Sequence, residues 1–165
     1  MATLHLLCGK IAAGKSTLAD VLAAAPGCVR LDEDTLMATL YPGEIATLED
    51  YSVRTLRLEA AIGPHVAALL RAGLDVVMDF HANTRRRRAW MRGIVQTSGC
   101  DHVLHRLDVA DAVCLERLHA RNAAGTHRYV VTDEEFHAFT RYFDPPGDDE
   151  GFRVVRHGVA VGRGD

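Results

Sequence analysis

The sequence predicts an α/β fold, a three-layer sandwich with helices on both faces of a sheet of about five parallel strands. Two observations support this prediction. Short apolar runs alternate with longer amphipathic segments along the chain, and this alternation is typical of βαβ units with parallel strands. The chain has 165 residues, of which 48% are hydrophobic, and this is enough for one core. We therefore expect a single domain over residues 1–165.

The first part of the chain supplies three of the expected strands, at 3–7, 28–31 and 74–80. The third reads LDVVMDF, an apolar run typical of a strand that is buried on both faces. Helical patterns cover 15–25 and about 53–71. These strands and helices form the first crossovers of the sheet.

The second part continues the alternation without an internal repeat, a low-complexity segment or a linker. We expect helices at about 86–97, 112–121 and 133–143, and strands at 102–107 and 152–156. All five strands therefore fit one parallel sheet.

Charge and cysteine content limit the expected environment. The net charge of −3 gives no basic field that attracts nucleic acid, so a nucleic-acid partner is allowed but not favoured. The four cysteines show no CxxC spacing, and the chain has neither a secretory signal pattern nor an apolar run long enough for a membrane span. We expect a cytoplasmic protein without membrane contact. Its oligomeric state is left open.

Residues 9–16 read GKIAAGKS, the pattern Gly-x-x-x-x-Gly-Lys-Ser, between a predicted strand and a predicted helix. There the backbone N–H groups wrap a polyphosphate, and the N-terminus of the helix points at it. This Walker A loop predicts the P-loop nucleoside triphosphate hydrolase fold. The residues expected to bind ATP through the loop are Gly9, Ala12, Ala13, Gly14, Lys15, Ser16 and Thr17.

The same loop holds the only two lysines of the chain, Lys10 and Lys15, although arginine is common elsewhere. Lys15 carries a compact ammonium that can reach the β and γ phosphates, whereas a planar guanidinium fork does not fit inside the loop. The hydroxyl of Ser16 is expected to ligate Mg²⁺. Lys10 is assigned no role.

The rest of the chain narrows the class of P-loop protein. A GTPase needs an Asn-Lys-x-Asp motif to read guanine, and both lysines already lie in the loop. An AAA-type motor normally carries a separate helical lid domain, for which the chain is too short. A small kinase is the class that fits.

Three aspartates lie near or just after the ends of predicted strands, at the sheet edge where α/β folds bind ligands. We expect Asp34 to accept the proton of the acceptor hydroxyl and Asp32 to orient magnesium-bound water. Capping of the next helix is the alternative for both. Asp79 ends VVMDF and is expected to reach the magnesium, with a bond to the following loop as its alternative.

The segment after that strand reads HANTRRRRAW. We expect His81 and Asn83 to bind the acceptor, with Asn83 or Thr84 also a candidate helix cap. The four arginines 85–88 span little more than one helical turn, so they cannot all face one ligand. Arg88 is assigned to the acceptor, and most of the others are expected on a solvated face.

Arg117 and Arg121 lie four residues apart on one helical face and lead into a Gly-containing loop. They are expected to close over ATP as part of a lid at about 117–131. The alternative is surface ion pairing with Glu116 or Glu134.

With these motifs the chain resembles the zeta-toxin and polynucleotide kinase group of P-loop kinases, which is similar to chloramphenicol phosphotransferase and gluconate kinase. The resemblance rests on the P-loop, LDEDTL, VVMDF and RLHARN. A closer similarity covers nearly the whole chain and rests on LYPGEI, DFHANTRRRRAW, RNAAGTH and FDPPGDDEGF. It links the chain to small bacterial proteins labelled as ATP-binding proteins or AAA family ATPases.

The resemblance implies that Asp34 is the catalytic carboxylate, that Arg117 lies against the adenine and that Arg121 reaches the phosphates. Several members of the group place an arginine three residues after the catalytic aspartate, where it holds a phosphate of the substrate. Met37 stands at that position here. This departure favours an apolar or sugar-like small acceptor over a phosphorylated one.

The sequence thus predicts an ATP-dependent phosphotransferase that uses Mg²⁺ and moves the γ-phosphoryl group of ATP to a hydroxyl of a small molecule. The expected catalytic residues are Lys15, Asp34, Arg117 and Arg121. One alternative is a polynucleotide or RNA 5′-hydroxyl kinase, or a toxin-type kinase. Another is an ATP-binding regulatory protein or an ATPase without an acceptor.

Overall fold

The structure, a computed structural model, describes residues 1–125 and 130–158. Within these ranges, five strands form one parallel sheet in the order β2-β3-β1-β4-β5. In chain order the elements are β1 (Thr3–Cys8), α1 (Lys15–Ala23), β2 (Cys28–Asp32), α2 (Glu33–Leu40), α3 (Leu48–Arg71), β3 (Asp75–His81), α4 (Arg85–Ser98), β4 (Asp101–Asp108), α5 (Asp111–Ala124), α6 (Asp133–Arg141), the 3-10 helix η1 (Asp148–Glu150) and β5 (Val154–Gly158). The predicted five-stranded parallel α/β fold is confirmed.

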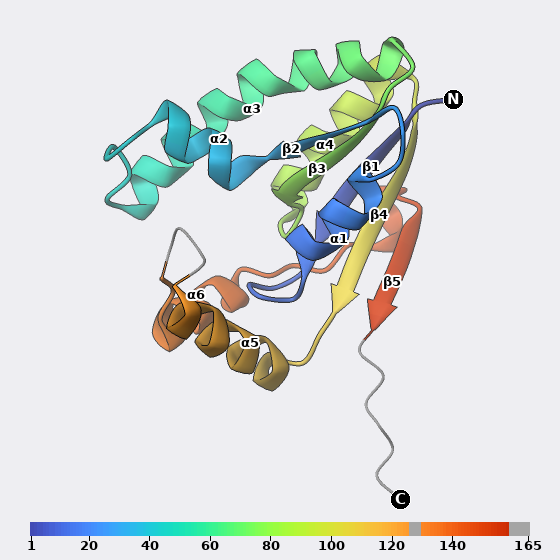
Figure 1. The fold of residues 1–165 in the computed structure, drawn as a ribbon. Coiled ribbons are helices and arrows are strands. Elements are labelled where there is room, and N and C mark those ends of the chain that lie inside the picture. Colours follow the sequence, from blue (N-terminus) through green and yellow to red (C-terminus); the bar gives the residue numbers. More distant parts are fainter. Residues whose placement is uncertain (126–129, 159–165) are drawn as a thin grey trace, which may run out of the picture.

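The helices cover the sheet in layers. Helices α3 and α4 lie on one face and α1 on the other, while α5 and α6 lie together beyond the carboxyl ends of the strands (Figure 1). The loop between β1 and α1 emerges at this same edge, in the middle of the sheet. Ligands bind at such an edge in open α/β sheets. None of the described helices combines the length and apolar character needed to cross a bilayer.

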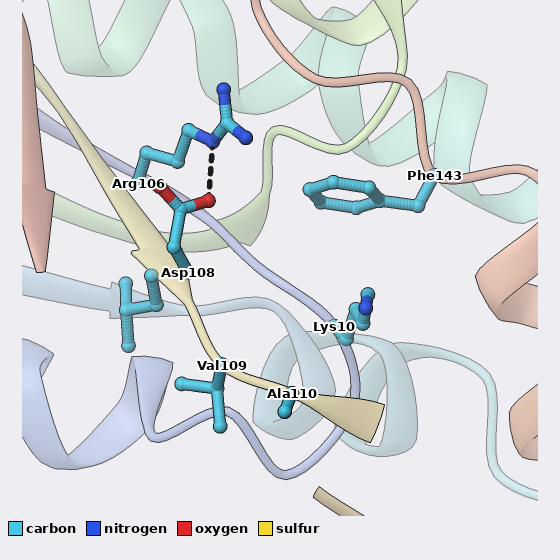
Figure 2. A pocket seen from close by; sticks show the side chains of 7 residues that line it. Lys10, Arg106, Asp108, Val109, Ala110 and Phe143 are labelled. Carbon is cyan, nitrogen blue, oxygen red and sulfur yellow. Dashed lines mark hydrogen bonds and ion pairs between the residues drawn. The ribbon is translucent and has the colours of Figure 1, made fainter. Parts of the chain in front are cut away.

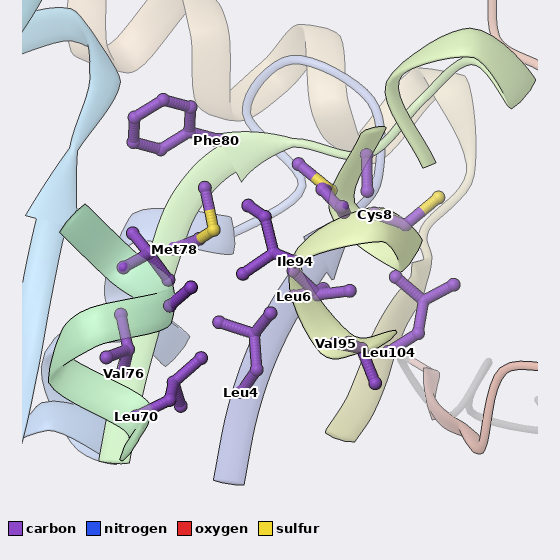
Figure 3. Packing of buried hydrophobic residues seen from close by; sticks show 14 of the residues in the cluster. Leu4, Leu6, Cys8, Leu70, Val76, Met78, Phe80, Ile94, Val95 and Leu104 are labelled. Carbon is purple, nitrogen blue, oxygen red and sulfur yellow. The ribbon is translucent and has the colours of Figure 1, made fainter. Parts of the chain in front are cut away.

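Alternate side chains of β1 enter two separate cores. Leu4, Leu6 and Cys8 are fully buried on the face covered by α3 and α4, with neighbours from β3 and β4 (Figure 3). On the other face Leu7 packs with Val77 against α1. Each such leucine contributes about 1.5–3 kcal/mol of apolar burial. Because both faces are covered, β1 and β3 are nearly continuous apolar runs, which explains why the sequence predicted them.

Two departures from the expected helices lie in the first half of the chain. Helix α3 begins at Leu48 rather than near 53, because Thr47 and Asp50 form a capping box. The Asp50 N–H donates to Thr47 Oγ1 at 3.0 Å, and the Thr47 N–H donates to Asp50 Oδ2 at 3.0 Å. The segment after β2, interpreted only through its possible cap residues, forms the helix α2.

Three imidazoles cross the sheet from β1 to the edge strand β5. His5 Nδ1 lies 3.0 Å from His105 Nε2, and His105 Nδ1 lies 2.9 Å from His157 Nε2. Burial, together with smaller effects of the charges of the two neighbouring imidazoles, lowers the pKa of His105 to about 4. Neutral imidazoles fit this row of three histidines, because each hydrogen bond joins one ring N–H to one unprotonated ring nitrogen. The histidines therefore tie β5 to the interior of the sheet.

Candidate active site

The P-loop has the backbone conformation that its sequence predicts. Gly14 has a φ of 103° and Ala12 a φ of 59°, so the chain turns back sharply before α1. A Cβ atom at Gly9 would lie 3.1 Å from Leu107 Cβ and 3.4 Å from Ala13 Cβ, so only glycine fits there without displacing its neighbours. No side chain caps α1, and its first turn has no acidic residue. Its N-terminal N–H groups are therefore suited to an anion.

Lys15 folds back over the loop. Its Nζ donates to Gly9 O and to Lys10 O, each at 2.7 Å. Burial lowers the pKa of Lys15 from its ordinary value, and the charge of Asp79 is the largest opposing influence, with a smaller one from Asp34. A partly desolvated ammonium in this position is suited to phosphate oxygens, which supply the missing negative charge.

Helix α5 contacts the P-loop through Arg117 and through one ion pair. Lys10 forms an ion pair with Asp111 in the first turn of α5. Arg117 Nη1 donates to Ala13 O at 3.2 Å, so this predicted lid arginine lies at the loop. The predicted lid, 117–131, includes residues 126–129, which lie outside the described residues.

Asp34 and Arg121 influence each other electrostatically. Asp34 is exposed in the first turn of α2. Burial lowers the pKa of Arg121, and the charge of Asp34 opposes this shift. Arg121 Nε is buried and has no hydrogen-bond partner within the described ranges. The charge of Asp34 thus acts on both Arg121 and Lys15.

Arg30, which the sequence interpretation did not include, separates the two aspartates expected at the metal. Arg30 Nη2 lies 2.6 Å from Asp79 Oδ2 and 3.3 Å from Asp32 Oδ2. Burial opposes the charge of Arg30, but its bond to Asp79 raises its pKa above the ordinary value. Residues 30 and 32 share one face of β2, and this period-two pattern is a signal that identifies Arg30.

Asp32 serves as the cap of α2. Its Oδ1 accepts from the Thr35 N–H at 2.9 Å, and its Oδ2 faces Arg30, so both oxygens are occupied. The structure therefore favours the capping alternative, and Asp32 is not assigned to the metal. A residue at this position fixes the start of α2 and hence the place of Asp34.

With Asp32 assigned to the helix cap, the side-chain oxygens of Ser16 and Asp79 remain, and they fit a magnesium ion that is held mainly by phosphate oxygens. No group of three or more histidine, cysteine or acidic side chains with metal-binding geometry occurs in the described part of the chain. Mg²⁺ in nucleotide sites takes one or two protein oxygens, with water and phosphate oxygens for the rest. Ser16 is exposed at the start of α1, and Asp79 contacts Arg30 only through Oδ2. These two residues would hold the ion.

Two residues assigned to the acceptor have other roles. The side-chain amide of Asn83 binds the backbone of Gly9. Asn83 Oδ1 accepts from the Gly9 N–H, and Asn83 Nδ2 donates to Gly9 O, each at 2.9 Å. Arg88 is fully buried, and it bonds Glu150 at 2.7 and 2.9 Å and the carbonyl oxygens of Ala82 and Asp144. Both expectations are corrected, because these side chains connect parts of the protein.

Arg87 also departs from the solvated face expected for most of the run, whereas Arg85 and Arg86 are exposed, at 56% and 54%. Arg87 is 2% exposed and pairs with two buried carboxylates, Glu33 at 2.9 Å and Glu59 at 3.3 Å. Arg86 holds Glu59 as well, through bonds of 2.8 and 3.0 Å. Arg87 and Arg88 share the buried side of α4 with Met91, so the helical period of the apolar residues is the signal that places them.

His81 joins this buried group of charges. Its Nε2 lies 3.0 Å from Arg87 Nη1 and 3.1 Å from the Tyr51 hydroxyl. Burial and the charge of Arg87 lower the pKa of His81 well below its ordinary value. Because Arg87 can only donate, Nε2 is the unprotonated nitrogen and the proton lies on Nδ1. His81 is thus a neutral donor, and it cannot act as the base through Nε2.

A cavity of about 280 Å³ adjoins the P-loop on the β4 side. Lys10 and Phe143 lie across it from the end of β4, where Arg106 Nε donates to Asp108 Oδ1 at 2.6 Å (Figure 2). Its lining residues are Lys10, Arg106, Leu107, Asp108, Val109, Ala110 and Phe143. Both cations are already paired with aspartates, so the cavity offers no unpaired charge to a phosphate.

Solved kinases share this fold. The structure superposes on a protein of Chloroflexus aurantiacus that is classed provisionally as a kinase, with a TM-score of 0.74, 18% identity, and coverage of 97% of this chain and 86% of that one. The APS kinase of Mycobacterium tuberculosis, in complex with AMPPNP and APS, gives a TM-score of 0.59 and 20% identity over 96% and 89% of the two chains. A gluconokinase from Sinorhizobium meliloti gives 0.60 and 19% over 96% and 82%.

Sequence families agree with the fold. Curated proteins gave no match to the chain. Residues 4–146, by contrast, match the model of a family described as AAA domain. This match includes the P-loop, Asp34, Asp79 and both arginines of α5. The chain therefore belongs to the AAA domain family and has the P-loop fold of the kinase type.

Proposed function

We propose that this protein is a kinase that transfers the γ-phosphoryl group of ATP to a hydroxyl of a small-molecule acceptor. The observation that carries the proposal is that the charge of Asp34 acts on both Lys15, in the P-loop, and Arg121, in α5. A nucleotide-binding protein without an acceptor needs the lysine, but it needs no carboxylate opposite it. Asp34 supplies that carboxylate, and the resemblance to solved kinases supports this reading.

Each residue has a defined part in the transfer. Lys15 leaves the carbonyl oxygens of the loop and donates to phosphate oxygens, while Arg117 and Arg121 offset the remaining charge. Asp34 accepts the proton of the acceptor hydroxyl. The hydroxyl oxygen forms a bond to the γ phosphorus as the bond from phosphorus to the β–γ bridging oxygen breaks, and ADP leaves.

Magnesium, when bound, neutralises charge on the β and γ oxygens. Ser16 and Asp79 are the residues of this chain that would hold it. Arg30 holds Asp79 in place near the end of β3 through the 2.6 Å contact. Asp32 holds the start of α2, so Asp34 is presented from a capped helix rather than from a loose loop.

Two positions that could supply a phosphate site for the acceptor, 37 and 87, do not do so. Met37 is 2% exposed and belongs to the main core, so this position supplies neither a cation nor a surface for the acceptor. Arg87 is likewise committed to Glu33 and Glu59. These observations support an uncharged hydroxyl compound over a phosphorylated one.

The test is mass spectrometry of a small-molecule cell extract after incubation with ATP, Mg²⁺ and the protein. We expect one species to gain a phosphoryl group with the wild type and not with Asp34→Asn, which keeps the shape of the side chain. A 5′-hydroxyl oligonucleotide in a parallel reaction tests the polynucleotide kinase alternative. ATP binding with no phosphorylated product in either reaction would overturn the proposal in favour of nucleotide sensing.

A further inference from the structure

Asn83 pairs with the first residue of the P-loop through both ends of its amide. The Gly9 N–H donates to Asn83 Oδ1, and Asn83 Nδ2 donates to Gly9 O, each at 2.9 Å. This pairing fixes which amide atom is oxygen, because the reverse orientation would place donor against donor. Seventy-four positions separate the two residues, so the contact joins the end of β3 to the loop after β1.

The carbonyl oxygen of Gly9 has a second donor, the ammonium of Lys15, at 2.7 Å. Lys15 must release this oxygen before it can reach a phosphate. Gly9 is buried, and a buried carbonyl that loses every donor is costly. Because Asn83 continues to donate, the oxygen keeps a partner after Lys15 moves.

The peptide that carries Asn83 is itself held on several sides. The Ala82 N–H donates to Leu7 O at 2.8 Å, and the Asp144 N–H donates to Asn83 O at 2.9 Å. Arg88 Nη1 donates to Ala82 O at 3.0 Å and to Asp144 O at 2.6 Å. These hydrogen bonds hold the backbone at Asn83 in place, so its side-chain amide can keep binding Gly9 while Lys15 changes its contacts.

We propose that Asn83 is a positioning residue that holds Gly9 in place while Lys15 moves from the loop carbonyls to the nucleotide. The proposal rests on the proposed binding of ATP at the P-loop. It assigns Asn83 no contact with the acceptor. Its consequence is that the chemistry of the side chain at 83, and not only its size, controls nucleotide affinity.

Asn83→Asp tests this directly, because aspartate has the same shape. The carboxylate can still accept from the Gly9 N–H, but its second oxygen faces Gly9 O and attracts Lys15. We expect the Kd for ATP, measured by calorimetry with Mg²⁺ at pH 8, to rise at least about tenfold relative to the wild type. At pH 5.5 the Kd of the variant should lie closer to that of the wild type, because a protonated carboxyl at position 83 would donate its O–H to Gly9 O as the amide does.

The matched control is Thr84→Ala. Thr84 caps α4 by accepting from the Arg87 N–H at 3.3 Å and does not touch the loop. We expect a lower Tm with a Kd for ATP within about twofold of the wild type at both pH values. The control separates loss of local stability from loss of loop positioning.

Each result decides the question. An Asn83→Asp protein that binds ATP as the wild type does at both pH values overturns the role of Asn83. So does an equal loss at pH 8 and pH 5.5, because it indicates a merely structural defect. Absence of ATP binding in the wild type overturns the proposed function itself, and it is recognised in the first titration.

Discussion

Arg88 joins α4 to the segment before β5, and its removal is expected to be the most destabilising single change in that run of arginines. Its side chain is 0% exposed, and that of its partner Glu150 is 7% exposed. Arg88→Ala removes the bonds of 2.7 and 2.9 Å to the Glu150 carboxylate and leaves Arg85, at the longer distance of 3.9 Å, as its only cation among the described residues. It also takes this donor from Ala82 O and Asp144 O. Breaking a buried ion pair from one side costs about 3–5 kcal/mol. For a chain of this size that cost lowers the Tm by roughly 10 °C.

Arg85 offers a control in the same helix. It pairs closely with Asp149, where both side chains are more than half exposed, at 56% and 68%, and its contact with Glu150 is long, at 3.9 Å. An exposed pair contributes about 0–1 kcal/mol, so Arg85→Ala should lower the Tm by no more than about 3 °C. Thermal unfolding followed by circular dichroism measures both variants. If the two variants melt at the same temperature, the argument from burial is refuted.

Three further predictions concern the site and the sheet. Lys15→Met should abolish phosphoryl transfer and weaken ATP binding, whereas Asp34→Asn should lower kcat by about a hundredfold or more and keep the Kd for ATP within about twofold; calorimetry and turnover assays separate the two. Gly9→Ala should weaken ATP binding and lower the Tm, since its Cβ would lie 3.1 Å from Leu107 Cβ, and an unchanged Kd would contradict the packing argument. Because the pKa of His105 in the folded protein, about 4, lies below the ordinary 6.5, protonation favours the unfolded chain, so stability should be greatest above pH 6.5 and fall as the pH drops towards 4. Urea unfolding at pH 7 and pH 5 should show this loss in the wild type, at up to about 1.4 kcal/mol per pH unit, and a smaller one in His105→Gln.

The sequence alone predicted the fold and the nucleotide loop, for a physical reason. The P-loop is a local structure, in which eight consecutive residues supply the turn, the lysine and the start of the helix. Strands buried on both faces are also local signals, as LDVVMDF at β3 shows. Asp34 was proposed because it follows a strand at the ligand-binding edge of the sheet, and Arg121 because it lies four residues from Arg117 on one helical face; their roles stay predictions.

Only the tertiary structure decided what the other polar side chains do. Arg87 meets Glu33 across 54 positions, Arg88 meets Glu150 across 62, and Asn83 meets Gly9 across 74. Helical periodicity places Arg87 and Arg88 on a buried face, but it does not say which carboxylates come to that face. The sequence therefore determined the fold and the phosphate-binding loop. Packing between distant segments determined which charged and amide side chains pair with one another, because a buried polar group requires a partner.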